Sequence, residues 1–336
     1  MRLHRSFVRS PARGRWTWAA VFVAAAACKA RAPRGDDAAP PPPEPPPQVS
    51  GLDAVPADAR AVIGVDVAAL AASPAATAAV RALLARDPAL ARRTRALLDA
   101  CHLVPARDVR RLWLATGPNP QQALLVAAGA LDAEALPRCV TEAVAAADGT
   151  VSATPGPPKV WASVPRAGPA VYFAFSAPDT VVASTDEAWL RAALAPGPKA
   201  STAADLAPLL ARVDRGAAVW AAGRVPSGVG GRLPALTGGA VRAPPTAMYF
   251  EFHVKAGVDA RLSAVMATAA DAAAAARFAR AQLRVLEVVA QGAALGGVVA
   301  KVRAAADGDT VTLRMALSDD ELRDAVSRID SALGVE

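Results

Sequence analysis

The chain has 336 residues, of which 53% are hydrophobic and 20% are charged, and its formal net charge is +7. Five arginines precede residue 16, and residues 29–50 hold three basic and three acidic side chains, so 29 basic and 27 acidic residues remain beyond residue 50. This nearly neutral body argues against nucleic acid as a partner, because affinity for phosphate comes from clustered Lys and Arg. The apolar content is sufficient for one large domain or two modest ones.

The N-terminus has the three parts of a secretory signal. Arginines stand before an apolar run from Trp16 to Ala27, and small residues lie at its exit. A helix that spans a membrane needs about 20 apolar residues, whereas this run has 12 and is soon followed by Lys29. We therefore expect residues 1–27 to be a cleaved signal peptide.

The exit of the run reads Ala25-Ala26-Ala27-Cys28 and resembles the lipobox of bacterial lipoproteins. The resemblance implies that Cys28 becomes the mature N-terminus and carries a diacylglycerol and a further acyl chain such as palmitate. Such an anchor is stable because several chains bury far more methylene than one. Ala25 stands where the family most often has Leu, so cleavage at an Ala-x-Ala site, with release of a soluble protein, is the alternative. Lys29, in place of a retaining Asp, points to the outer membrane.

Residues 28–50 are predicted to be a lipid-anchored Cys followed by a disordered linker. Pro40 to Pro47 is interrupted only by Glu44, and such a run adopts extended polyproline II at about 3.1 Å per residue. Two interpretations are open. The linker is either a stalk that holds the body away from the bilayer or a plain tether.

Residues 51–198 are predicted to form an α+β domain. Ser73-Pro74 and Asp87-Pro88 each combine an N-cap residue with Pro at the first helical position, and Gly117 to Pro120 is a turn between two strands. The pattern predicts strands over 62–67, 109–116, 121–129, 150–154, 160–164, 170–175 and 180–184, and helices over 74–86, 88–101, 132–147 and 185–194.

Residues 199–336 are predicted to form a second α+β domain after the break at Ala195 to Pro198. In one strand Phe250, Phe252 and Val254 alternate with Glu251, His253 and Lys255. This alternation predicts one buried face and one solvent-exposed face. Ser318 and Glu321 form a capping box for the last helix. The pattern predicts helices over 205–213, 268–290 and 318–333, strands over 217–222, 298–305 and 310–317, a Gly-rich loop over 227–239 and a hairpin over 246–266.

The two halves share a coarse order of elements but no residue-level identity. Strands joined by tight turns and interspersed with helices indicate mixed or antiparallel sheets with helices packed on one face, in two similar tandem units. Residues 55–74, VPADARAVIGVDVAALAASP, resemble the start of uncharacterised periplasmic lipoproteins of high-GC bacteria. That resemblance implies no known activity.

Cys101 and Cys139 form an even pair once Cys28 is set aside, and an oxidising compartment favours a disulfide. In the predicted elements Cys101 ends one helix and Cys139 lies on the next, and both helices flank one strand pair. A bridge would therefore form if the helices share a face of the sheet. The alternative is two buried free thiols.

Residues that could carry chemistry are sparse. The body has only His102 and His253, no metal site of usual spacing can be assembled, and no nucleophile elbow is present. Ser227 to Gly231 and Gly197 to Ser201 lack the spacing of nucleotide-binding loops. We expect no metal, no cofactor and no enzymatic activity.

Asp66 is the one acidic residue inside an apolar strand, and it binds a ligand, caps the next element or lies exposed at an edge. The aromatic residues have two interpretations as well, because such rings serve either as sugar-binding platforms or as core. They are Trp113, Trp161, Tyr172, Trp189, Trp220 and Tyr249.

The sequence thus predicts a non-enzymatic cell-envelope lipoprotein, a binding or scaffold module tethered to a membrane by acylated Cys28. We expect it in the outer membrane, facing the periplasm or the surface, with an unknown envelope protein or small ligand as partner. The alternative is a solute-binding lipoprotein with a cleft between its two units. A hydrolase with a site that leaves no motif is a third interpretation.

Overall fold

The computed structural model describes residues 49–85, 87–154, 156–166, 168–226, 234, 237–255, 257–292 and 295–333. The predicted signal peptide, Cys28 and nearly all of the linker lie outside these residues. So does most of the Gly-rich loop.

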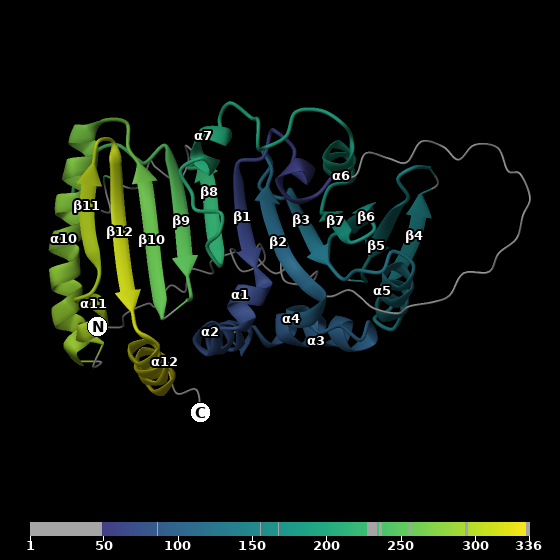
Figure 1. Cartoon of the computed structure of the whole chain (residues 1–336), viewed down its shortest axis with the longest axis horizontal. Helices are drawn as coiled ribbons and strands as arrows, with labels where there is room; N and C mark the ends of the chain where they lie inside the picture. Colours follow the sequence, from purple (N-terminus) through teal and green to yellow (C-terminus); the bar gives the residue numbers. More distant parts are fainter. Residues whose placement is uncertain are drawn as a thin grey trace, which may run out of the picture.

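One sheet of 12 strands extends along the molecule (Figure 1). Its strands are β1 (Ala61–Asp66), β2 (Val109–Thr116), β3 (Ala123–Gly129), β4 (Thr150–Thr154), β5 (Val160–Val164), β6 (Val171–Ala177), β7 (Thr180–Ser184), β8 (Val219–Arg224), β9 (Ala247–His253), β10 (Val258–Val265), β11 (Arg303–Asp307) and β12 (Thr310–Leu317). The order is β11-β12-β10-β9-β8-β1-β2-β3-β7-β6-β5-β4, and every neighbouring pair is antiparallel.

Helices connect and cover these strands. They are α1 (Val67–Ala71), α2 (Pro74–Ala85), α3 (Pro88–Ala100), α4 (Pro105–Asp108), α5 (Ala135–Ala145), α6 (Glu187–Leu194), α7 (Ala207–Leu210), α10 (Ala269–Gly292), α11 (Gly296–Val299) and α12 (Asp319–Leu333), with a 3-10 turn η1 at Gly51–Ala54. None of the helices that the structure describes has both the length and the hydropathy needed to cross a bilayer.

The two halves of the chain follow the same path. In the first half β1, β2 and β3 form a meander, α5 follows, and β7 returns beside β3. In the second half β8, β9 and β10 form a meander, α10 follows, and β12 returns beside β10. The predicted α+β class, with antiparallel strands in two similar units, is confirmed. Because β1 and β8 pair with each other, the sheet continues from one half into the other.

The sequence pattern predicts helices on one face of the sheet. In the first half, helices cover both faces. Along β7, Val182 points to one face, whereas Val181 and Ala183 point to the other, as the period of two in a strand requires. Side chains of α6 and α7 fill the first face, and those of α3 and α5 fill the second. Both faces of this half are therefore apolar.

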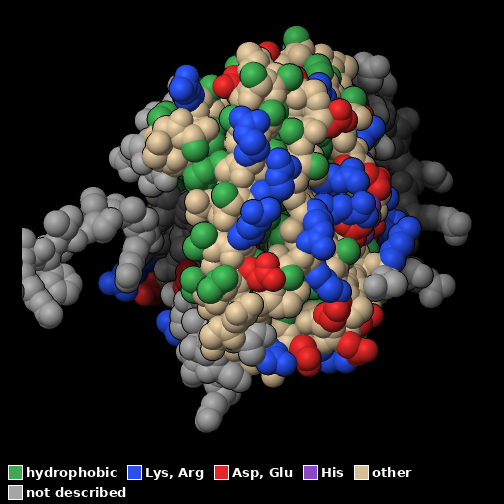
Figure 2. Space-filling model, turned by 90° about the vertical axis from the view of Figure 1, so that its left-hand side faces the viewer, with side chains coloured by type: hydrophobic (Ala, Val, Ile, Leu, Met, Phe, Trp, Pro, Cys, Tyr) green, Lys and Arg blue, Asp and Glu red, His purple; other side chains and the backbone are tan. Residues whose placement is uncertain are grey.

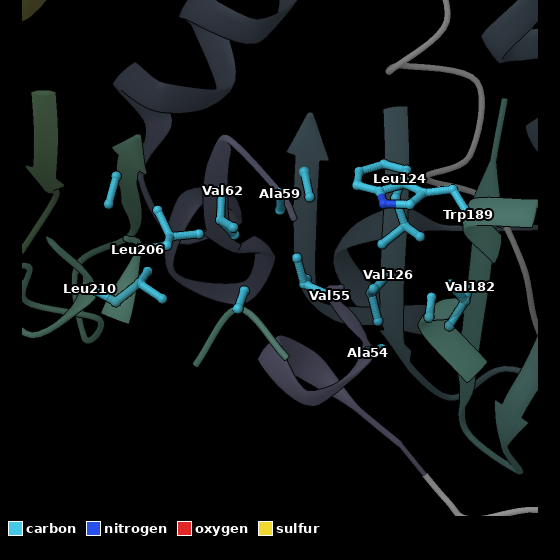
Figure 3. Close-up of a cluster of buried hydrophobic side chains, with 14 of the residues drawn as sticks. Ala54, Val55, Ala59, Val62, Leu124, Val126, Val182, Trp189, Leu206 and Leu210 are labelled. Atoms are coloured by element: carbon cyan, nitrogen blue, oxygen red, sulfur yellow. The ribbon is translucent and has the colours of Figure 1, made fainter. Parts of the chain in front are cut away.

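The larger core lies under α6 and α7 (Figure 3). Leu124, Val126 and Val182 come from β3 and β7 and are fully buried. Trp189 and Leu206 pack against the same cluster, and the indole N–H of Trp189 donates to Asp58 at 2.9 Å. This packing joins the end of the first half to the start of the second.

Cys101 and Cys139 form a disulfide with a Cα–Cα distance of 5.2 Å. Cys101 follows the end of α3, and Cys139 lies on α5. The two helices pack on the same face of the sheet. The bridge therefore fixes one helix to the other across the apolar cluster.

Three details of the second half differ from the sequence-based expectation. Residues 296–299 form α11, so β11 begins at Arg303 and not at 298, and α7 spans only four residues. Glu251, expected on a solvent-exposed face, is buried and accepts a hydrogen bond from the backbone N–H of Asp214 at 2.9 Å. The turn before β8 covers this face of β9, and an alternating strand pattern cannot reveal such a cover.

Candidate functional site

A cleft of about 440 Å³ opens where the two halves of the sheet meet. Strands β1 and β2 supply one side from the first half, and the start of β8 with the turn before it supplies the other. Its lining residues are Leu52, Asp53, Val65, Asp66, Arg111, Trp113, Ser201, Arg215, Ala217 and Trp220.

Two aromatic residues of the cleft lining, Trp113 and Trp220, lie in one row across three strands with Gly64 between them. Gly64 on β1 pairs with Trp113 on β2 and with Trp220 on β8. A Cβ atom added at Gly64 would overlap the indole ring of Trp220, so only glycine leaves room for that ring. Trp220 itself is 4% exposed, and therefore only its rim reaches the cleft.

A second glycine, Gly51, lies against the ring of Trp113. Gly51 has φ +59, and a Cβ placed there would lie 3.2 Å from the ring of Trp113. A glycine tolerates this left-handed backbone and this close approach, whereas a larger residue would be strained. Trp113 is half-buried and packs against the large core cluster. Its ring thus joins the core to the wall of the cleft.

Charged side chains of both signs surround these two aromatic residues. Asp66 is the register partner of Arg111 in the β1–β2 pair, and Asp53 and Arg215 lie on the other walls. One carboxylate oxygen of Asp66 accepts the backbone N–H of Ala69 at 2.9 Å and so caps α1. Asp66 therefore acts as a cap and also lines the cleft.

A buried lysine, Lys199, attaches the segment that carries Ser201 to the end of α6. The Lys199 ammonium donates to the backbone carbonyls of Ala192, Ala193 and Ala195 at 3.1, 2.7 and 2.8 Å, which satisfies the C-terminal end of α6. Burial lowers the pKa of Lys199. The Ser201 hydroxyl donates to Asp53 at 3.3 Å. This hydrogen bond connects the Ser201 segment to η1.

Most other residues singled out in the sequence lie in the core or on the surface. Trp161 stacks on Phe173 with ring centroids 5.4 Å apart, and Tyr172 and Tyr249 pack against the core. His102 is exposed, and His253 lies 3.8 Å from a carboxylate oxygen of Asp214. Among the described residues no group of three or more His, Cys, Asp or Glu is arranged to hold a metal ion.

Sequence reasoning missed the cleft as a set of residues. The sequence pattern points to Asp66, Trp113 and Trp220 separately, and no local signal marks Arg111 or Arg215 as their neighbours. The available signal was Gly64, because a glycine inside a strand often marks a close approach of another group.

Fold and site together define an antiparallel α+β protein whose sheet carries a polar cleft at the junction of two similar halves. No protein-family description and no curated protein matches the chain by sequence. Its structure is similar to that of TP0453. Crystal form III of that protein has 12% identity and a TM-score of 0.45, over 84% of this chain and 98% of the other. Crystal form I has 11% identity and a TM-score of 0.43, over 84% and 97%.

Proposed function

We propose that this chain is a non-enzymatic cell-envelope lipoprotein, held on a membrane by acylated Cys28, that binds a small polar solute in the cleft between its two halves. Two parts of the chain support the proposal separately. The lipobox-like sequence supports the anchor, and the cleft supports the binding role.

The observation that carries the binding role is the composition of the cleft. Two carboxylates and two guanidinium groups line a hollow whose floor is aromatic. Its volume of about 440 Å³ falls in the usual range for small-molecule sites, roughly 300–1,000 Å³. The lining combines an apolar floor with a few convergent polar groups, which is the pattern that such sites show.

The charges indicate the class of ligand. Arg111 and Arg215 offer donors that match a carboxylate or phosphate, and Asp53 and Asp66 offer acceptors for an ammonium or hydroxyl group. A small solute that carries both kinds of group satisfies both sets. The rim of Trp220 and the ring of Trp113 would contact its apolar part.

The test is a thermal-shift screen of the protein against small zwitterionic and anionic solutes. A ligand at about 100 times its Kd stabilises the folded state by about 2.7 kcal/mol, which raises Tm by several degrees. Arg111→Ala should abolish the rise without lowering Tm in the absence of ligand, because Arg111 is exposed. Arg110→Ala is the matched control, because Arg110 precedes Arg111 on β2 and pairs with Asp179 away from the cleft.

A screen that raises Tm for none of the solutes would contradict the binding role. A rise that persists at full size in Arg111→Ala would contradict the placement of the ligand in this cleft. Either result would leave the anchor at Cys28 to be judged separately.

A further inference from the structure

The last part of α10 exposes large aliphatic side chains to solvent. Val285, Leu286, Val288 and Val289 are 58%, 52%, 66% and 69% exposed. We call these four residues the apolar end of α10. Nearer the start of the helix, by contrast, Ala272 is fully buried and packs with Met266 and Val241. The exposed fractions of the four residues show that the apolar end is open to solvent.

A surface helix normally presents polar residues on its solvent side. Four large aliphatics within five consecutive positions depart from this pattern, whereas single exposed valines such as Val80 and Val164 are ordinary. Contiguous exposed apolar surface marks a contact with another molecule or with a membrane.

Basic side chains accompany the apolar end. Arg277, Arg280 and Arg284 are all exposed and follow one another at i, i+3 and i+7, so they lie along one side of the helix. No acidic residue occurs between Asp271 and Glu287. Figure 2 looks onto the end of the molecule where α10 lies, and it shows Lys and Arg side chains gathered along this face with hydrophobic side chains beside them.

We propose that α10 docks on an anionic lipid surface, with the apolar end entering the boundary between headgroups and acyl chains. The helix would lie in the plane of the interface, because its other side packs against β11 and β12. Arg277 and Arg284 would contact lipid phosphates while their stems lie along the apolar boundary. Arg280, whose guanidinium donates to the Ala304 carbonyl at 3.1 Å, adds its positive charge beside them. The partner is thus a membrane whose surface carries negative charge.

A second copy of the chain is the other candidate occupant. An isologous contact would bring two copies of the same patch together. The three arginines of each copy would then lie close to those of the other copy and repel them. Charge complementarity therefore favours the anionic membrane. The proposal does not depend on acylation at Cys28 or on the central cleft.

The test places one environment-sensitive fluorophore on the full chain. In a Cys28→Ser background, Val289→Cys supplies a single labelling site, because Cys101 and Cys139 are bridged. Val80→Cys is the matched control, since Val80 is also an exposed helical valine. Each labelled protein is mixed with vesicles of phosphatidylglycerol and phosphatidylcholine, and with vesicles of phosphatidylcholine alone. This readout reports which surface meets lipid, whatever else holds the chain there.

We expect a blue shift at position 289 and none at position 80, and only with the anionic vesicles. Adding Arg277→Gln and Arg284→Gln, or raising the salt concentration, should reduce the shift. Introducing Val285→Gln should weaken vesicle affinity by about tenfold, because a valine side chain is no longer buried.

Equal responses at both positions, or no response at position 289, would overturn the proposal. A shift at position 289 that depends on protein concentration in the absence of vesicles would overturn it too, because it would assign the apolar end to self-association.

Discussion

At the scale of single residues, Gly64 makes room for the ring of Trp220, which lines the cleft. It lies on the central strand between Trp113 and Trp220, and the Trp220 indole occupies the space where a side chain would be. The Trp220 ring can lie over this position only because Gly64 has no Cβ. One glycine therefore links the packing of the core to the floor of the binding site.

Gly64→Ala should destabilise the protein and disturb the cleft. The added methyl group overlaps the Trp220 ring, and overpacking of this kind costs about 1–3 kcal/mol. The free energy of unfolding in guanidinium chloride measures the effect. Gly292→Ala is the control, because nothing lies within 4 Å of the added Cβ there. Equal stability of Gly64→Ala and the wild type would show that Trp220 is not held against Gly64.

Asp108 should make the protein sensitive to acid. Its buried carboxylate accepts two hydrogen bonds from Arg107, at 2.7 and 2.8 Å, and one from the Val104 N–H at 2.8 Å. The hydrogen bonds from Arg107 hold the pKa of Asp108 below its usual range. A lowered folded-state pKa stabilises the protein above the unfolded value of about 4, and this stabilisation is lost as pH falls through the folded-state pKa.

Asp108→Asn should therefore lose about 2 kcal/mol at pH 7, and its deficit relative to the wild type should shrink toward pH 3. Urea unfolding at a series of pH values measures this difference. Asp99→Asn changes an exposed carboxylate and should run parallel to the wild type. A deficit that is constant with pH would show that Asp108 does not titrate in this way.

At the scale of elements, the sequence predicts those whose signals are local. The caps and prolines before α2 and α3 and the capping box before α12 lie at the predicted places. In the capping box the Ser318 N–H donates to the Glu321 carboxylate at 2.9 Å, and the Glu321 N–H donates to the Ser318 hydroxyl at 3.3 Å. These signals need only neighbouring residues.

The elements that sequence reasoning missed depend on distant contacts. Residues 298–299 are β-branched and favour a strand, but they form α11, which packs against the end of α10. Glu251 alternates with phenylalanines, which favours exposure, but the turn at Asp214 covers it. The cleft likewise depends on the pairing of β1 with β8, two strands more than 150 residues apart in the chain. No local pattern encodes that pairing.

Removing the disulfide should cost much of the stability of the first half. The bridge closes a loop with a sequence separation of 38, which corresponds to about 4 kcal/mol in the chain-entropy model. Cys101→Ser combined with Cys139→Ser should lower the unfolding midpoint in guanidinium chloride. The wild type under a reducing agent should unfold at the same midpoint as this double variant. An unchanged midpoint in both samples would show that the two cysteines do not pair in the folded protein.

At the scale of the whole molecule, two similar halves form one sheet and place the cleft at their junction. In the proposed arrangement the linker connects this body to a lipid at Cys28, the cleft binds a polar solute, and α10 docks on the anionic surface nearby. The anchor is the premise that places the other two roles in the cell envelope.

The most direct test of that premise is the intact mass of the mature protein expressed in a bacterial host, compared with Cys28→Ser. We predict a wild-type chain that begins at Cys28 and carries the mass of a diacylglycerol and a further acyl chain, and a variant that lacks this added mass. A wild-type chain that is cleaved elsewhere, or that begins at Cys28 without added mass, would contradict the lipid anchor.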